Sequence, residues 1–280
     1  MKILLTGAAG FTGLFFKRYA EAAGHSVWSL AADLTDKAAV AAEVMKAQPS
    51  AVVHLAAISF VGHADELAFY AVNVVGTTNL LSALADLPSK PEKVLLASSA
   101  NVYGNCEASP ITEEQPPAPV NHYATSKLAM EHMSLAFLDR LPIVITRPFN
   151  YTGPGQAPQF LIPKLVNHFA SVAVRIELGN LHVEREFNDV RMVCEAYLRL
   201  LERGEPGQIY NVCSGQPYTL ECVLATLERI TGHRMVVDVN PAFVRANEVH
   251  RLCGGPQKLH SAIGKLDGWG LSDTLSWMLE

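Results

Sequence analysis

The stretch ILLTGAAGFTG constrains the fold more than any other feature of this sequence. An apolar run, residues 3–6, is followed at once by three glycines spaced three residues apart, and then by a helical pattern. Glycines at this spacing permit a tight turn and let the backbone approach a pyrophosphate, which then lies at a helix N-terminus. The stretch therefore predicts a strand, turn and helix that bind a dinucleotide. The residues expected to contact it are Gly7, Gly10, Phe11, Thr12 and Gly13.

Strand-length apolar segments alternate with helical patterns through the first half of the chain. The expected strands are 3–6, 27–30, 51–55, 94–97 and 143–146, and the expected helices are 14–23, 36–47, 64–85 and 123–138. Continuous apolar strands that alternate with helices are typical of a parallel sheet covered on both faces. We therefore expect an α/β fold with a doubly wound parallel sheet, a Rossmann domain, over residues 1–150.

After residue 150 the sequence becomes richer in Pro and Gly, with short strand patterns such as RIEL, IYNVCS and RMVVDV. We expect residues 151–280 to form mainly a smaller, mixed substrate-binding region over the carboxyl ends of the strands, where open α/β sheets bind ligands. Some of its elements should return to the Rossmann domain.

Composition narrows the class of protein. The net charge is −5 with a pI near 6.1, so the chain has no basic surplus for nucleic acid. Its five cysteines are scattered without CxxC spacing, which predicts no metal site and favours a reducing compartment. No segment reads as a signal sequence or approaches the ~20 apolar residues of a membrane span. We expect a cytoplasmic protein.

The second expected strand lacks the residue that usually follows it. Such strands end in an acid that binds the ribose 2′-hydroxyl of NAD, or have an Arg nearby for the 2′-phosphate of NADP. Here the strand ends in Leu-Ala-Ala, Asp33 follows late, and no Arg or Lys lies in 27–36. Asp33, with Leu34, either faces the adenine or is a turn residue. The choice between NAD and NADP stays open.

A Tyr and a Lys lie one helical turn apart in HYATSKLAMEHM. Tyr123 and Lys127 therefore share a helix face, which alone would indicate only a surface pair. However, the preceding strand ends in Ser98 and Ser99, so all these side chains are expected at the carboxyl edge of the sheet. A nearby ammonium favours the phenolate of a tyrosine, whose pKa is otherwise ~10. Ser99, Tyr123 and Lys127 together suit hydride chemistry at a carbinol or ketone carbon.

These motifs resemble the extended short-chain dehydrogenases/reductases that act on nucleotide sugars. The matching segments are TGAAGFTG, HLAA at 54–57, NVVGT at 73–77, SSANVYG, YATSK and RPFN at 147–150. The resemblance implies that Ser99, Tyr123 and Lys127 are catalytic, and that Tyr123 and Lys127 also contact the cofactor. It further implies cofactor contacts from Leu55, Ala56, Ala57 and Pro148, an NAD or NADP cofactor, and a homodimer. Taken alone, HLAA and NVVGT would indicate only close packing of small residues.

The second half of the chain is most similar to GDP-6-deoxy-D-mannose reductases, which reduce the 4-keto group of GDP-4-dehydro-6-deoxy-mannose to make GDP-D-rhamnose. The similar strings are RPFNYTGPGQ, GNLHVEREFNDV, GQIYNVCSGQPYTL and RANEVHRLCGGPQKL. The residues expected at the nucleotide sugar are Ser99, Asn101, Asn150, Arg185, Arg245 and Glu248. Arg suits a diphosphate because its guanidinium binds two oxygens at once.

Three features depart from that pattern: Tyr151 where His is expected, Asn101 where Glu is usual, and a short connection after the second strand. The short connection is similar to that of dTDP-4-dehydrorhamnose reductases. Related dehydratases need a carboxyl group at position 101, and an amide has no proton to exchange near pH 7. The sequence therefore predicts reduction without dehydration. An NDP-sugar 4-epimerase, a dTDP-4-dehydrorhamnose reductase and a non-enzymatic dinucleotide sensor remain as alternatives.

Overall fold

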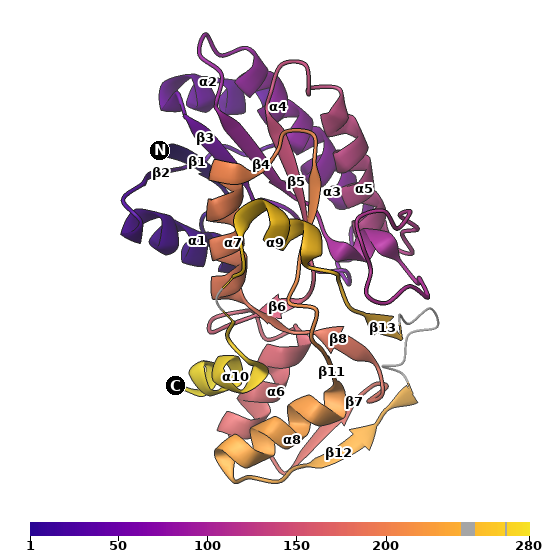
Figure 1. The fold of residues 1–280 in the computed structure, drawn as a ribbon. Coiled ribbons are helices and arrows are strands. Elements are labelled where there is room, and N and C mark those ends of the chain that lie inside the picture. Colours follow the sequence, from indigo (N-terminus) through magenta and orange to yellow (C-terminus); the bar gives the residue numbers. More distant parts are fainter. Residues whose placement is uncertain (242–249, 267) are drawn as a thin grey trace.

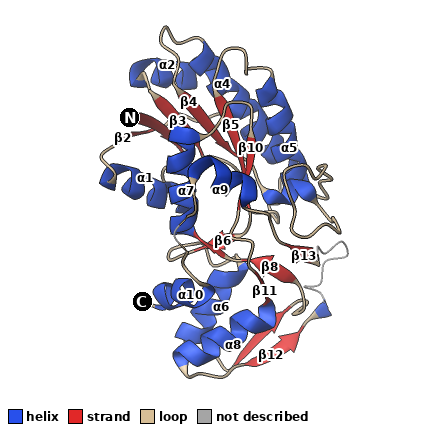
Figure 2. Cartoon of the chain, in the orientation of Figure 1, coloured by secondary structure: helices blue, strands red, loops and turns tan. Residues whose placement is uncertain are grey.

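The larger part of the molecule is built around a six-stranded parallel sheet (Figures 1 and 2). The computed structural model describes residues 1–241, 250–266 and 268–280. The strands are β1 (Lys2–Thr6), β2 (Ser26–Ser29), β3 (Ala51–His54), β4 (Lys93–Ala97), β5 (Ile143–Pro148) and β10 (Ile209–Val212), in the order β2-β1-β3-β4-β5-β10. The five strands expected in the first half are present to within two residues, and the doubly wound α/β fold is confirmed.

Strand β10 comes from the second half of the chain. It belongs to the IYNVCS segment and pairs with β5 in register Ile209 to Ile145. The sheet is therefore completed by a strand that is remote in sequence.

Helices cover both faces of this sheet. One face carries α1 (Phe11–Ala22), α7 (Val190–Arg203) and α9 (Gln257–Ile263), and the other carries α2 (Lys37–Ala47), α4 (Thr77–Ala85) and α5 (His122–Leu135). Successive side chains of a strand point to opposite faces. Thus Ile3 and Leu5 pack with the first set of helices, and Leu4 packs with the second. Two hydrophobic cores, one on each face, hold the sheet in place.

A continuous helical segment runs from Glu66 to Ala85 as α3 (Glu66–Tyr70), η1 (Ala71–Gly76) and α4. An 18-residue window within these 20 residues has a mean hydropathy of 1.4, so by length and composition the segment could span a membrane, contrary to the expectation from sequence. Half of that window is buried inside the fold, and α4 packs in the core with α2. Its apolar character is that of a core helix.

The smaller part lies beyond the carboxyl ends of the strands (Figure 1). It contains the sheet β11-β8-β13, the pair β12-β7, the pair β6-β9 and three helices packed around one apolar core. The bounds are β6 (Tyr151–Thr152), α6 (Leu161–Ala170), β7 (Arg175–Leu178), β8 (Glu184–Glu186), β9 (Asn188–Asp189), β11 (Pro217–Thr219), α8 (Leu220–Thr231), β12 (Val236–Val239), β13 (Arg251–Leu252) and α10 (Leu271–Leu279).

Arg191 ties the C-terminal helix to the larger part. Its guanidinium lies 4.6 Å from the ring centroid of Trp269 and 3.9 Å from that of Trp277, and it forms two hydrogen bonds with Asp189. The same carboxylate accepts a hydrogen bond from Thr274. One arginine at the start of α7 thus holds α10 against the Rossmann side of the molecule.

Candidate active site

The loop after β1 has the shape of a phosphate cradle. Gly7 has φ +69°, and a Cβ there would lie 2.8 Å from the amide N of Ala56. A Cβ at Gly13 would lie 2.0 Å from the carbonyl O of Gly7. Gly10 is the N-cap of α1, and no side chain caps the amides that follow it. The loop can therefore bring bare backbone amides against a diphosphate, and the site fits a dinucleotide.

A buried hydrogen-bond chain connects the glycine loop to the neighbouring strand. The side-chain oxygen of Thr6 accepts hydrogen bonds from the amides of Leu55 and Ala56, and lies 2.7 Å from Nδ1 of His54. Nε2 of His54 lies 2.9 Å from the hydroxyl of Thr77. Burial lowers the pKa of His54 to about 3, and the positive charge of Lys127 adds to this effect. His54 is thus a neutral structural bridge.

Further hydrogen bonds connect these loops to the helix that carries Tyr123. Asn73 accepts a hydrogen bond from the amide of Ile58 and donates one to Ser126, whose hydroxyl donates to the carbonyl O of Tyr123. HLAA and NVVGT are therefore more than close-packed small residues, because their polar side chains fix the loops of the site. Both motifs are visible in the sequence, but these contacts could not be predicted from it, since they join residues up to 53 positions apart.

The structure brings Ser99, Tyr123 and Lys127 together at the carboxyl end of β4. Ser99 is the N-cap of η2 (Ala100–Tyr103) and hydrogen-bonds the phenol of Tyr123. The ammonium of Lys127 donates a 2.8 Å hydrogen bond to the carbonyl O of Ala97, the last residue of β4. All three side chains are buried, with 7%, 7% and 4% of their residue surfaces exposed. Loss of contact with solvent therefore affects the pKa values of the phenol and the ammonium.

Burial shifts the pKa of two of these groups. It raises the pKa of the Tyr123 phenol, and the hydrogen bond from Ser99 opposes this only in part. The expectation that Lys127 would bring this phenol toward neutral pH is wrong for this structure, because loss of solvent outweighs the stabilising contacts. Burial also lowers the pKa of Lys127 to about 8, against the opposing charge of Glu131.

An ion pair buried beneath the site was not singled out from the sequence. Arg147, in RPFN, donates to both carboxylate oxygens of Glu131, with N to O distances of 2.9 and 2.6 Å. Glu131 lies one helical turn after Lys127, so the pair joins β5 to the helix that carries Tyr123.

The remaining predicted cofactor residues lie along the same edge. Leu55, Ala56 and Ala57 directly follow β3 and are partly buried, and Pro148 ends β5. Asp33 is exposed and forms a turn, in which its carboxylate accepts two hydrogen bonds from Thr35. This turn leaves the carboxylate of Asp33 exposed and does not decide between the two readings, so the contact of Asp33 with the adenine stays a prediction. The side chain of Leu34 packs in the core.

The predicted sugar-binding residues are only partly described. Asn101 is in η2, two residues after Ser99, and Asn150 is exposed just after β5. Arg185 is in β8, the central strand of the smaller sheet, and donates to the carbonyl O of Glu184. Arg245 and Glu248 lie outside the described residues.

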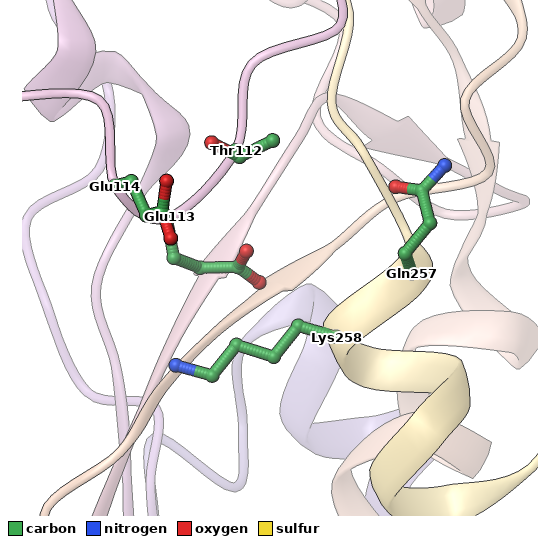
Figure 3. Close-up of a pocket in the computed structure, with 5 residues that line it drawn as sticks. All are labelled: Thr112, Glu113, Glu114, Gln257 and Lys258. Carbon is green, nitrogen blue, oxygen red and sulfur yellow. The ribbon is translucent and has the colours of Figure 1, made fainter.

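A separate pocket of about 440 Å³ lies between residues 112–114 and the start of α9 (Figure 3). Its lining residues are Thr112, Glu113, Glu114, Gln257 and Lys258. Two of its three charged lining residues contact β10: Glu113 accepts a hydrogen bond from the amide of Asn211, and the ammonium of Lys258 lies 5.3 Å from the ring centroid of Tyr210. None of the predicted site residues that the structure describes lines this pocket.

Comparison with known proteins agrees with this geometry. Residues 3–213 match the model of the NAD dependent epimerase/dehydratase family. The chain is 37% identical to a GDP-6-deoxy-D-talose 4-dehydrogenase of Aggregatibacter actinomycetemcomitans, covering 94% of this chain and 92% of that protein. It is 36% identical to a GDP-6-deoxy-D-mannose reductase of Pseudomonas aeruginosa, covering 94% and 91%.

Solved structures show the same fold. A crystal structure from Burkholderia cenocepacia J2315 is 48% identical, with a TM-score of 0.95 over 99% of this chain and 96% of that one. RMD from Pseudomonas aeruginosa, complexed with NADPH, is 33% identical with a TM-score of 0.93 over 99% and 97%. A Thermus thermophilus UDP-glucose 4-epimerase, in complex with NAD, is 28% identical with a TM-score of 0.86 over 100% and 98%. The chain therefore belongs to the NAD dependent epimerase/dehydratase family of extended short-chain dehydrogenases/reductases, and is an NAD(P)-dependent enzyme that modifies nucleotide sugars.

Proposed function

We propose that the protein reduces the 4-keto group of a nucleotide-linked 4-keto-6-deoxy sugar, namely GDP-4-dehydro-6-deoxy-D-mannose, to form GDP-D-rhamnose. The observation that carries the proposal is the buried cluster of Ser99, Tyr123 and Lys127 at the carboxyl end of β4, with an amide at Asn101 in place of a carboxyl group. The similarity to a GDP-6-deoxy-D-mannose reductase supports it.

Each residue of the cluster has its own role in the proposed reduction. When bound, the reduced nicotinamide supplies the hydride to C4. Tyr123 donates its phenolic proton to the ketone oxygen, and Ser99 hydrogen-bonds the same oxygen. The raised pKa of the Tyr123 phenol keeps it protonated at neutral pH, as a proton donor must be. The ammonium of Lys127 favours the phenolate that forms as the proton leaves.

The nucleotide sugar is expected to extend from this cluster over the smaller part of the molecule. Asn101 and Asn150 follow β4 and β5 at the edge of the sheet, where they can hydrogen-bond the sugar. The side chain of Arg185 is half-buried and carries the fixed charge that a diphosphate requires. Arg245 and Glu248 complete the proposed binding set.

A second product is favoured by one specific observation, the 37% identity to a GDP-6-deoxy-D-talose 4-dehydrogenase. Talose and mannose differ only in configuration at C4, so the two products arise by hydride addition to opposite faces of the same ketone. A 4-epimerase, another of the alternatives, would transiently oxidise a sugar alcohol and retain its cofactor.

The test is incubation with GDP-4-dehydro-6-deoxy-D-mannose and NADH or NADPH, followed by the absorbance of the reduced nicotinamide and by NMR of the product. Consumption of NAD(P)H with formation of GDP-D-rhamnose is expected, and formation of the talose epimer would select the second candidate. In a parallel reaction with GDP-mannose and NAD(P), steady accumulation of the 4-keto-6-deoxy product would refute the reductase assignment. Interconversion of UDP-glucose and UDP-galactose without added cofactor would favour the epimerase.

We also propose a cytoplasmic homodimer. Three apolar side chains are exposed on α3, η1 and α5: Leu67, Val75 and Leu135, with 77%, 52% and 46% of their surfaces accessible. Helices α3 and α5 pack side by side, so these residues are available to a second copy. Sedimentation that gives a monomer at micromolar concentration would refute the dimer.

A further inference from the structure

The loop after β2 lies beside the glycine loop. Strands β1 and β2 pair with Leu5 opposite Ser29, and the amide of Leu30 donates to the carbonyl O of Leu5 at 2.9 Å. The next residues of β2 therefore follow the start of the glycine loop. In sheets of this type, that corner receives the ribose whose 2′ position distinguishes NAD from NADP.

A carboxylate from outside the strand occupies this corner. Glu43, on α2, accepts hydrogen bonds from the amide of Ala31 at 3.0 and 3.1 Å and from the amide of Ala32 at 2.8 Å. It also accepts one from the indole N–H of Trp28 at 3.1 Å. The two amides that follow Leu30, those of Ala31 and Ala32, are thus directed at a negative side chain.

Two carboxylates lie in the segment that follows β2 or are bound to it. Burial raises the pKa of Glu43, but its hydrogen bonds, led by Ala31, outweigh burial and lower it, so the group is ionised at neutral pH. Asp33 adds a second carboxylate two residues after Ala31, and its contacts with Thr35 lower its pKa. Two cations lie over the indole ring of Trp28: the ammonium of Lys2, in β1, is 5.5 Å from the ring centroid, and that of Lys46, on α2, is 5.7 Å from it. No Arg or Lys lies in residues 27–36.

We propose that Glu43 sets the preference of this enzyme for NAD(H) over NADP(H). Its carboxylate supplies, from α2, the acid that the second strand lacks. A ribose 2′-hydroxyl can donate to that carboxylate, whereas a 2′-phosphate would meet two like charges and would find the amides of Ala31 and Ala32 already bound to Glu43. The proposal goes beyond the proposed function, because it depends on the NAD(P) cofactor of the family and not on which 4-keto sugar is reduced.

The test is a titration of the purified protein with NADH and with NADPH, followed by nicotinamide fluorescence without any sugar nucleotide. Wild-type protein is expected to bind NADH roughly tenfold or more tightly than NADPH. In Glu43→Gln, which keeps the shape and one acceptor, this ratio should fall toward one, chiefly through tighter binding of NADPH. The matched control is Asp36→Asn, which removes the same charge from the N-cap of α2. Asn caps a helix as well as Asp, so the control should keep the wild-type ratio.

Salt provides a second measurement on the unmodified protein. Between about 0.05 and 0.5 M ionic strength, screening should narrow the NADH to NADPH ratio. The proposal is overturned if wild-type protein binds NADPH as tightly as NADH, if Glu43→Gln and Asp36→Asn change the ratio equally, or if salt widens it. Since no sugar nucleotide is present, these outcomes are independent of whether the 4-keto sugar is the substrate.

Discussion

The phenolic oxygen of Tyr151 lies 2.7 Å from the hydroxyl oxygen of Thr12, and its ring stacks on Phe11 at a centroid separation of 6.2 Å. Thr12 and Phe11 form the first turn of α1, directly after the glycine loop. Burial raises the pKa of Tyr151 to about 12, so its hydroxyl remains a neutral partner. The residue after RPFN therefore braces the predicted cofactor loop from the start of β6.

Removing that hydroxyl should weaken binding of the dinucleotide. Tyr151→Phe keeps the stacking on Phe11 but loses a hydrogen bond that contributes about 0.5 to 1.5 kcal/mol. We expect the Kd for NADH to rise roughly two- to tenfold, with kcat nearly unchanged. The matched control is Tyr70→Phe, which removes a hydroxyl that is hydrogen-bonded to His122 at 3.0 Å. An equal effect in both variants, or a loss confined to kcat, would contradict this role.

The proposed proton donor gives the largest expected effect on rate. Tyr123→Phe should lower kcat for ketone reduction by ~10²- to 10⁴-fold, because positioned proton transfer contributes that much. Binding of NADH, measured by fluorescence, should stay within about threefold of wild type, since the ring and its packing remain. A variant that keeps more than half of the wild-type rate would remove Tyr123 from the mechanism.

The pH dependence of the reduction rate should reflect the ionisation of Lys127 rather than that of Tyr123. Burial raises the pKa of the phenol above its ordinary value near 10, whereas burial lowers the pKa of Lys127 to about 8. Below pH 8 the ammonium is charged and favours the forming phenolate, and above pH 8 this charge is lost. We expect kcat/KM for the 4-keto sugar to fall above about pH 8 with a slope of one proton.

Lys127→Arg tests that assignment. An arginine stays charged throughout this range, so the variant should lose the decline near pH 8 even if its overall rate is lower. If this variant keeps the decline in kcat/KM near pH 8, the decline belongs to a group other than Lys127. A wild-type profile that is flat to pH 10 would likewise contradict the assignment.

Breaking the buried ion pair under the site should cost stability. Arg147 and Glu131 each expose only 4% of their side chains, so Arg147→Met leaves an uncompensated carboxylate in the interior. We expect a loss of about 3 to 5 kcal/mol in the free energy of unfolding by urea. In the matched control, Arg175→Met breaks a pair whose side chains are 68% and 39% exposed, and should cost less than about 1 kcal/mol. Similar losses in both variants would contradict the argument.

Much of the fold could be predicted because its signals are local. The alternation of apolar strands and helices in the first half, and the glycines after β1, are visible within windows of about a dozen residues. Strand β10 was recognised as a strand, but its partner, β5, lies more than 60 residues earlier. No local pattern specifies such a pairing, which depends on how α7 returns the chain to the sheet.

The site was predictable where one motif carries its residues, and not where distant segments meet. The positions of Ser99, Tyr123 and Lys127 follow from the ends of β4 and the start of α5. Glu43 was missed because an acid on an amphipathic helix ordinarily faces solvent. The direction of the pKa shift of Tyr123 was also wrong, since it depends on a depth of burial that the sequence does not show.

Asn101 offers a test of what the enzyme does not do. In a 4-keto sugar the proton on C5 is acidic because it lies next to the ketone, and a carboxylate at position 101 could remove it, whereas an amide cannot. With the preformed 4-keto sugar in D₂O and no reduced cofactor, wild-type protein should incorporate no deuterium at C5 above the buffer rate. Asn101→Glu should accelerate this exchange at least about tenfold, and Asn101→Gln, of nearly the same size, should not. The measurement is the C5 proton signal in one-dimensional NMR. Exchange in the wild-type protein, or equal exchange in the Glu and Gln variants, would mean that another base reaches C5 and that the amide does not separate reduction from dehydration.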